Sequence, residues 1–138
     1  MSCIFCRIVA GEIPAEIVAS DDGGVAFLDL QPLADGHTLI VPRVHAPSIE
    51  ALDATTSDGL FRLVRRLADP VRRAVDAAGS TIGVNNGEAS GQTIPHVHVH
   101  IVPRWPNDGA GSVHTIFPRH TSRSLGEVAA AIRKAAGG

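Results

Sequence analysis

The sequence predicts one domain that combines β-strands with α-helices. Residues 94–102 alternate histidines with β-branched apolar side chains, which is the period of two expected of a half-buried strand. Residues 16–22 and 25–30 are also strand-like, and the Asp-Gly-Gly turn between them predicts a β-hairpin. Between residues 60 and 78, apolar side chains recur instead at helical spacing. A chain of 138 residues is long enough to give one such domain a hydrophobic core.

Shorter elements complete the predicted domain. The N-terminal residues to about Gly11 are expected to form a short helix, which a proline ends soon afterwards. Residues 36–42 and 81–84 are predicted strands. Ser124 begins a Ser-Leu-Gly-Glu capping box, which predicts the start of a C-terminal helix.

The helix predicted between residues 60 and 78 has signals at both ends and one interruption. Residues 55–58 offer an N-cap, and Gly79 stands at the expected C-terminal end. Pro70 lies inside the pattern and should kink or split the helix, because proline has no backbone N–H. The arginines within residues 62–73 are expected to form a solvated face. The apolar stripe of the same helix should be buried in the core or in a dimer.

Composition excludes several classes of partner. The formal net charge is −2, so the chain lacks the basic field expected of a nucleic-acid-binding protein. Aromatic residues make up 4%, with no tyrosine, which argues against a base-stacking surface. No apolar run is long enough to span a bilayer, and no signal-peptide core is present, so we expect no membrane association and a cytoplasmic location.

Three histidines give the chain its strongest functional signal. His96, His98 and His100 occupy alternate positions of the predicted strand, so their imidazoles should share one face at a spacing of roughly 6.5–7 Å. Packing alone rarely places three histidines in register. The row is therefore either a metal-binding face, since imidazole is the commonest metal ligand, or a catalytic face with one nucleophile and two supporting groups.

Two cysteines form a second candidate site. Cys3 and Cys6 make a Cys-x-x-Cys motif, and in a reducing compartment metal binding or redox chemistry is expected of them rather than a disulfide. A thioredoxin-like pair needs a preceding strand, and only two residues precede Cys3. A zinc half-site, which needs two further ligands, and a chance spacing both remain. His114 and His120 receive no role and are expected to be exposed loop residues.

The polar segment 85–93 directly precedes the histidines. A glycine-bearing loop is a weak phosphate signal by itself, but this position favours a phosphate cradle. Backbone N–H groups would approach the ligand, and Gln92 and Thr93 would add side-chain donors. Asp29 ends the second hairpin strand, where a turn or cap role is the default. His37 and His45, taken alone, have the default of ordinary surface or edge histidines.

Together these motifs resemble the histidine-triad (HIT) nucleotide-binding family, and their spacing resembles its Hint branch. The resemblance covers about residues 3–106 and leaves 107–138 as an extension of a single HIT domain. It rests on motifs in the family's order: Cys3-x-x-Cys6, the turn at Asp29, residues 36–42 with a following histidine, residues 85–93, and the triad. Thr93 departs from the serine of many Hint members but keeps the hydroxyl. The tail after Trp105 departs from the short tails of eukaryotic members.

The resemblance implies a fold and a mechanism. The fold is α+β, an antiparallel sheet of about five strands with a packed helix, and two copies form a homodimer. In the mechanism, His98 attacks the α-phosphate of a nucleotide, and water then releases the nucleoside monophosphate without a catalytic metal. The implied catalytic residues are His37, His96, His98 and His100. The implied nucleotide-binding residues are Asp29, Leu30, His37, Asn85, Gly91, Gln92, Thr93, His98 and His100.

A structural zinc is implied by the related galactose-1-phosphate uridylyltransferases. Mapped onto this chain, its ligands would be Cys3, Cys6, His45 and His96, a closed set with no position left to activate water. The expected substrate is a purine nucleoside phosphoramidate, because Thr93 can pass a proton to a leaving amine. Three alternatives remain: a dinucleoside polyphosphate hydrolase, a nucleotide-binding interaction module with incidental activity, and a zinc or copper protein that uses the triad as ligands.

Overall fold

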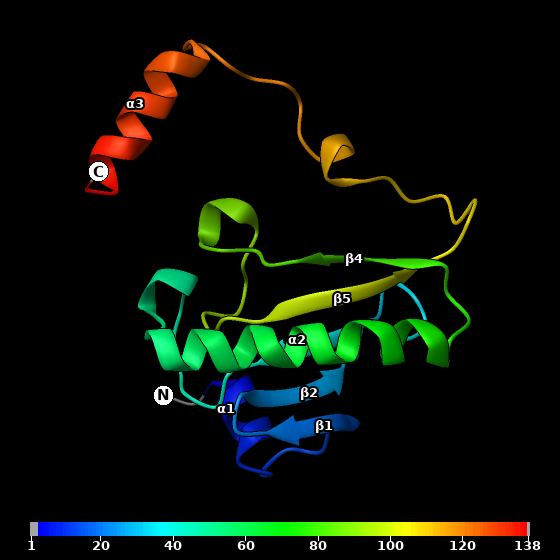
Figure 1. The fold of residues 1–138 in the computed structure, drawn as a ribbon. Coiled ribbons are helices and arrows are strands. Elements are labelled where there is room, and N and C mark those ends of the chain that lie inside the picture. The colour runs from blue at the N-terminus through cyan, green and yellow to red at the C-terminus, as the bar shows by residue number, and fades with distance from the viewer. Residues whose placement is uncertain (1–2, 138) are drawn as a thin grey trace. The chain divides into compact units, whose positions relative to one another are not determined.

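The computed structural model describes residues 3–137, which divide into two compact units. The first unit ends at Asp108 and the second begins at Gly109. The first unit holds a five-stranded antiparallel sheet in the order β1-β2-β3-β5-β4 (Figure 1). The strands are β1 (Ile17–Asp21), β2 (Gly24–Leu28), β3 (Thr38–Val41), β4 (Gly79–Gly83) and β5 (Val99–Arg104). The predicted α+β architecture with about five antiparallel strands is confirmed.

Two helices cover opposite faces of this sheet. Helix α1 (Ile4–Val9) and the longer helix α2 (Ala54–Ala74) contribute to separate hydrophobic clusters. Alternate residues of β2 divide between them: Ala26 packs with α2, whereas Val25 and Phe27 pack with α1. This follows from the strand period of two, which sends successive side chains to opposite faces. The sheet is therefore the middle layer of the first unit, with α2 crossing one face (Figure 1).

The long helix differs from its prediction at both ends. It begins after Asp53, whose side chain accepts a 2.7 Å hydrogen bond from the Thr56 N–H, so the N-cap precedes the predicted 55–58 window. It ends at Ala74, and Gly79, predicted at its C-terminal end, instead begins β4. Pro70 does not split the helix. It lies on the exposed side in the last turn and a half, where water can satisfy the carbonyl that loses its N–H partner.

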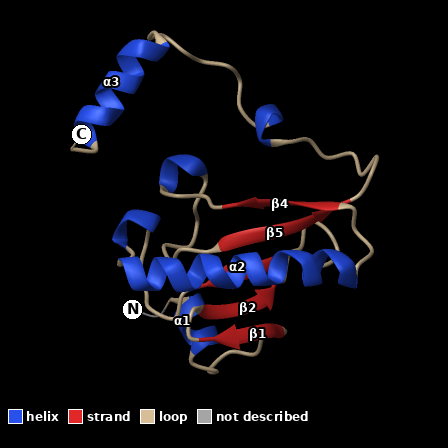
Figure 2. Ribbon diagram, in the orientation of Figure 1, coloured by secondary structure: helices blue, strands red, loops and turns tan. Residues whose placement is uncertain are grey.

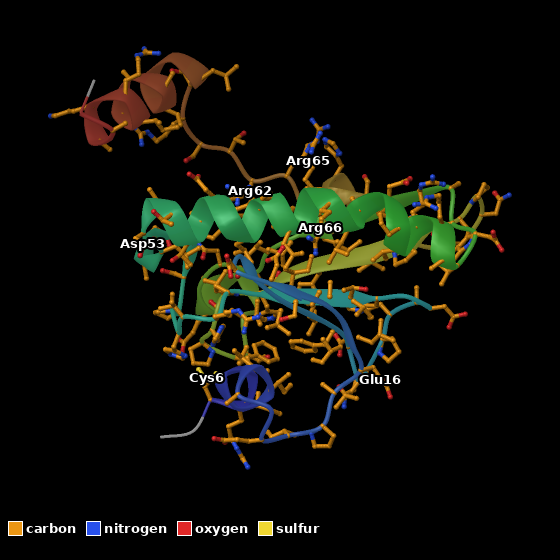
Figure 3. The ribbon with its side chains drawn as sticks, turned by 60° about the horizontal axis from the view of Figure 1, so that its bottom comes forward. Cys6, Glu16, Asp53, Arg62, Arg65 and Arg66 are labelled. Carbon is orange, nitrogen blue, oxygen red and sulfur yellow. The ribbon has the colours of Figure 1, made fainter. Side chains whose placement is uncertain are left out.

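The solvent face of α2 carries the predicted arginines. Arg62 and Arg65 are exposed, and Arg66 pairs with Asp21 at the edge of the sheet (Figure 3). The apolar stripe of the helix is buried against the sheet, including Leu60 and Leu63. The solvated face and the buried stripe are thus both confirmed.

The strand predicted over residues 94–102 begins only at Val99, and this is a correction. The partner strand β3 pairs Ile40 with Val99 and ends one residue later, before Pro42. Pro42 has no N–H to continue the ladder, so the chain from His96 to His98 leaves the regular pairing. The alternation survives, because the apolar residues of the stretch still pack on the α2 side: Val97, Val99 and Ile101.

The connections include short 3-10 turns η1 (Ile49–Ala51) and η2 (Glu88–Ser90). The second unit contains η3 (Val113–Thr115) and helix α3 (Leu125–Ala135), joined by loops (Figure 2). Ser124 accepts a 3.2 Å hydrogen bond from the Glu127 N–H, so the predicted helix start is confirmed. His114 and His120 are exposed, as expected. Across residues 3–137, no helix is long and apolar enough to cross a membrane.

Candidate active site and metal cluster

A pocket of about 530 Å³ lies on the α1 side of the sheet. One part of its wall is apolar and comes from α1, β2 and β3, including Phe5, Phe27 and Leu39. Among the predicted site residues, six line this pocket: Asp29, Leu30, His37, Thr93, His98 and His100. A hollow with an apolar wall and a few polar groups at one end is the usual form of a small-molecule site.

His98 is held in one tautomer by the backbone. Its Nδ1 lies 2.8 Å from the carbonyl oxygen of His96. A carbonyl can only accept, so Nδ1 carries the proton and Nε2 of the neutral ring keeps its lone pair. The ring is buried, and it packs edge-on against Phe5 with centroids 5.0 Å apart. The fold therefore offers an oriented, unprotonated imidazole nitrogen in the pocket wall.

A second chain of hydrogen bonds fixes the tautomers of His37 and His100. The Leu33 N–H donates to His37 Nδ1 at 3.1 Å, so the proton of neutral His37 is on Nε2. His37 Nε2 lies 2.9 Å from His100 Nδ1 and donates to it. His100 must then carry its proton on Nε2. That atom is buried and has no hydrogen-bond partner within residues 3–137, so it is a donor available to a ligand.

Burial keeps these two imidazoles neutral. Burial lowers the pKa of His37, and the nearby Asp29 carboxylate opposes this only in part. Burial, followed by repulsion from protonated His98 and His37, lowers the pKa of His100 to about 4. Both rings are therefore neutral near pH 7, which the donor-acceptor chain requires.

The loop before the triad is held by hydrogen bonds within it and by bonds to neighbouring backbone. Gly91 adopts a left-handed conformation with φ of 98°, which glycine accommodates without steric strain. Asn85, Gly91 and Gln92 do not line the pocket, whereas Thr93 does. The Gln92 side chain bonds to three backbone groups of the protein. Both N–H groups of the Gln92 amide are used in these bonds. In this conformation the side chain therefore has no N–H left to donate to a phosphate, the role predicted for it.

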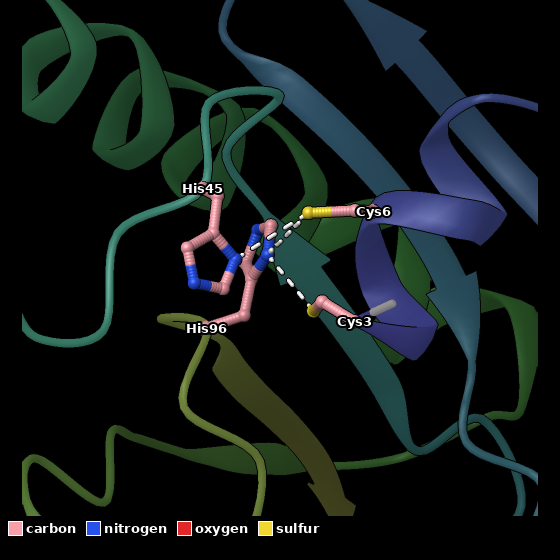
Figure 4. A group of neighbouring side chains, drawn as sticks. All are labelled: Cys3, Cys6, His45 and His96. Carbon is pink, nitrogen blue, oxygen red and sulfur yellow. Dashed lines mark hydrogen bonds between the residues drawn. The ribbon is translucent and has the colours of Figure 1, made fainter. Parts of the chain in front are cut away.

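Cys3, Cys6, His45 and His96 come together in a second cluster (Figure 4). Their four candidate ligand atoms all lie within 4.8 Å of one another. Cys6 Sγ is 3.4 Å from His45 Nδ1 and 3.5 Å from His96 Nδ1. His96 Nε2 donates to the Pro42 carbonyl at 3.0 Å, which leaves Nδ1 unprotonated toward the sulfurs. These residues could hold a metal ion, and two cysteine sulfurs with two imidazoles, of which His96 is oriented by the Pro42 carbonyl, suit tetrahedral zinc.

The three triad histidines do not form one metal site. His96 turns its ring to the cysteine cluster, whereas His98 and His100 lie in the pocket wall. Asp29, His37 and His100 are close enough to form another metal group. However, the His37 and His100 nitrogens that face each other share a hydrogen bond, which occupies the lone pair a metal would need. This arrangement disfavours the interpretation of the triad as a set of zinc or copper ligands.

Several groups of the site were not found from the sequence. Phe5 packs against both His96 and His98. The Leu33 N–H and the Pro42 carbonyl set histidine tautomers, although backbone groups carry no residue-type signal. The apolar character of the segment after Cys3 was the available clue to Phe5, and it gave no indication of which face the ring would cover.

Comparisons with known proteins cover most of the chain. The family profile described as "HIT domain" matches residues 10–107. The adenosine 5'-monophosphoramidase hnt1 of Schizosaccharomyces pombe is 37% identical over 111 residues, which is 80% of this chain and 80% of that protein. The adenylylsulfatase HINT3 of Arabidopsis thaliana is 36% identical over 106 residues, or 77% of this chain and 54% of that protein. A zinc-bound histidine triad family protein from Mycobacterium smegmatis is 35% identical, with a TM-score of 0.76 over 89% of this chain and 86% of that one.

The buried neutral histidines predict an acid-sensitive fold. The pKa of His100 is lowered in the folded state, so its unfolded form binds a proton first as pH falls. The stability that neutral His100 contributes to the fold is complete above about pH 6.5 and is lost progressively toward about pH 4. In urea titrations across this range, His100→Gln should reduce the slope of unfolding free energy against pH by up to about 1.4 kcal/mol per pH unit. The exposed-loop control His114→Gln should keep the wild-type slope, and equal slopes in all three proteins would contradict the assignment.

Proposed function

The chain belongs to the histidine-triad (HIT) family, and we propose that it is a hydrolase that forms a nucleotidyl intermediate on His98. The observation that carries this proposal is the 2.8 Å hydrogen bond from His98 Nδ1 to the His96 carbonyl. It leaves the Nε2 lone pair of a neutral ring available as the nucleophile. The pocket supplies room for a nucleoside beside that ring.

In the proposed first step, His98 Nε2 attacks the α-phosphorus while the bond from phosphorus to the leaving nitrogen breaks. His100 Nε2–H donates to a phosphate oxygen as its negative charge grows, and His37 fixes His100 in the required tautomer. The Thr93 hydroxyl gives its proton to the departing amine. Water then attacks phosphorus, breaks the bond to His98 and returns a proton to Thr93. His96 contributes its carbonyl to His98 and its ring to the cysteine cluster.

The remaining predicted contacts divide between the sugar and the phosphate. Asp29 and Leu30 lie at the mouth of the pocket, where they suit the ribose. Asn85, Gly91 and Thr93 belong to the loop that would hold the α-phosphate, and Gln92 supports that loop through its backbone contacts. The apolar wall near Phe5 and Phe27 would take the base.

A purine nucleoside phosphoramidate is the proposed substrate. An amine leaves poorly without a proton, and Thr93, which carries a hydroxyl, lines the pocket. Residues 85–93 contain no lysine or arginine to hold the charge of a polyphosphate leaving group. The similarity to an adenosine 5'-monophosphoramidase supports this choice. The similarity to an adenylylsulfatase supports an acidic leaving group as the alternative to be tested against it.

His98→Ala should abolish turnover, with kcat/KM at least about 10³-fold lower, because the nucleophile is gone. It should leave adenosine monophosphate binding largely intact, since the other pocket groups remain. Rapid quenching of wild type with an adenosine phosphoramidate, followed by intact-mass measurement, should detect protein carrying one adenylyl group. His114→Ala is the control with wild-type behaviour. Retained turnover in His98→Ala would refute the nucleophile assignment.

The leaving group is tested at Thr93. Thr93→Val removes the hydroxyl at nearly constant volume, so it should slow phosphoramidate cleavage by roughly 10²-fold. Cleavage of adenylyl sulfate or a dinucleoside polyphosphate, whose leaving groups need no proton, should change much less. Thr93→Ser keeps the hydroxyl and is the matched control. Equal losses in kcat/KM on both kinds of substrate, or faster wild-type cleavage of the dinucleoside polyphosphate, would count against the proposal.

Zinc is the proposed occupant of the cysteine–histidine cluster. Bound there, it would connect α1 to the segment before β5 and supply structure rather than an open coordination position. Cys3→Ser should therefore clearly lower the zinc content and the melting temperature. The kcat of the protein that remains folded should change little. Elemental analysis of protein purified without added metal measures the content, with the exposed-loop variant His120→Asn as control. Wild-type protein that is purified without metal, or whose melting temperature does not change when a chelator is added, would argue against a structural zinc.

Two further predictions belong to the same proposal, and one outcome separates it from an alternative. A homodimer is implied by the family resemblance, and its solution mass would be twice that of the 14.4 kDa chain. Residues 107–138 are proposed as an extension of a single HIT domain built on about 3–106. The alternative is a nucleotide-binding interaction module with incidental activity. It is excluded if the adenylyl intermediate forms and turns over at a rate typical of enzymes.

A further inference from the structure

One glutamine side chain connects three separate stretches of backbone. Gln92 Oε1 accepts a 2.8 Å hydrogen bond from the Gly87 N–H. Gln92 Nε2 donates to the Pro47 carbonyl at 2.8 Å and to the Ile94 carbonyl at 3.0 Å. A primary amide has two N–H donors, and both are used in these contacts. The side chain therefore acts on the protein's own backbone.

The three connected stretches carry different parts of the site. Gly87 begins the turn of the loop that continues to Thr93 at the pocket wall. Pro47 lies two residues after His45, and Ile94 lies two residues before His96. Gln92 thus links the loop to the backbone next to both histidines of the cysteine cluster.

Few other contacts hold the loop in place. The Ser90 hydroxyl donates to the Gly87 carbonyl, which closes the turn on itself without reaching another segment. Asn86 accepts from the Ile49 N–H and donates to Glu50. It therefore attaches the loop to the segment that follows Pro47. The residues between Gly87 and Gly91 are exposed. The loop therefore depends on neighbouring backbone that the cluster is placed to fix.

A metal ion in the cluster would fix His45 and His96 relative to each other and to the cysteines. The carbonyls of Pro47 and Ile94 would then stand at a fixed separation, which suits the two donors of the Gln92 amide. A loop that is ordered before the ligand arrives loses less conformational entropy on binding, so affinity rises.

We propose that Gln92 is a positioning residue that couples the cysteine–histidine cluster to the phosphate loop. Metal binding strengthens nucleotide binding through it, and nucleotide binding strengthens metal binding by the same factor. This inference rests on the proposed function, because it needs a nucleotide in the pocket and zinc in the cluster. It adds a link between the two sites and a role for Gln92 that involves no direct contact with the phosphate.

The test measures binding of adenosine monophosphate by calorimetry with zinc-loaded and chelator-treated protein. In wild type, removal of zinc should raise the dissociation constant about 5- to 10-fold, within the usual range of coupling between sites. In Gln92→Met, which keeps the length but loses the polar atoms, affinity should be weakened similarly in both states and should no longer depend on zinc. Ser90→Ala removes a hydrogen bond confined to the loop, so it should retain the wild-type dependence.

A second measurement needs no variant. The Gly87 amide bonds directly to Gln92, so its hydrogen exchange in wild type should accelerate when zinc is removed and slow when zinc returns. The inference is overturned if Gln92→Met keeps the zinc dependence, or if Gly87 exchange ignores zinc. Wild type that binds adenosine monophosphate equally with and without zinc overturns the coupling alone and leaves the proposed function standing. Wild type that binds no adenosine monophosphate overturns both.

Discussion

The pairing of β3 with β5 determines where the histidines of the candidate site lie. Leu39 of β3 stands opposite His100 of β5, so His37, just before β3, reaches His100 across the ladder. The same ladder stops at Pro42, whose carbonyl receives the ring N–H of His96. One strand pairing therefore places His37 against His100 and turns His96 toward the cysteines. The two sites share a backbone, and a shift in register would disturb both.

Backbone groups rather than charged side chains select the protonation states of the site. A carbonyl fixes the proton on Nδ1 of His98, and another fixes it on Nε2 of His96. The amide of Leu33 fixes it on Nε2 of His37. Burial lowers the pKa of His37 and His100 and keeps these two rings neutral, so the hydrogen bond between them has a defined direction. This series of hydrogen bonds ends at Nε2 of His100, which has no partner among residues 3–137, and a buried donor without a partner is costly unless a ligand satisfies it.

The cysteine–histidine cluster and the pocket share the segment 94–98. His96 belongs to the cluster and His98 to the pocket, with only Val97 between them. Val97 points to the α2 face and packs in the core, which holds both neighbours on the other side of the sheet. Phe5 packs against both rings, so α1 supports His98, the proposed nucleophile, while it carries Cys6 and is preceded by Cys3. The cluster is thus joined to the proposed nucleophile by backbone and by Phe5, which suits the structural role proposed for it.

Local patterns in the sequence determined much of the fold. The Asp-Gly-Gly hairpin, the apolar stripe of α2 and the Ser124 cap depend on neighbours a few residues away, and each was predicted correctly. The family resemblance, which carried the five-stranded sheet, rested on motif order and is confirmed by the matched profile. It also named the four residues that the structure brings together as a possible metal site.

Only the tertiary structure decided how the site residues are used. The strand at the triad begins at Val99 rather than Ile94, because its partner strand β3 ends just before Pro42. Pro42 lies more than fifty residues earlier in the chain. Gln92 faces Pro47 and Ile94 instead of the pocket, which a motif cannot reveal because a glutamine amide serves either purpose. The tautomers of His37, His96 and His98 depend on backbone partners that have no signature in residue type. Sequence periodicity specifies the face a side chain takes, whereas long-range pairing specifies which group it meets there.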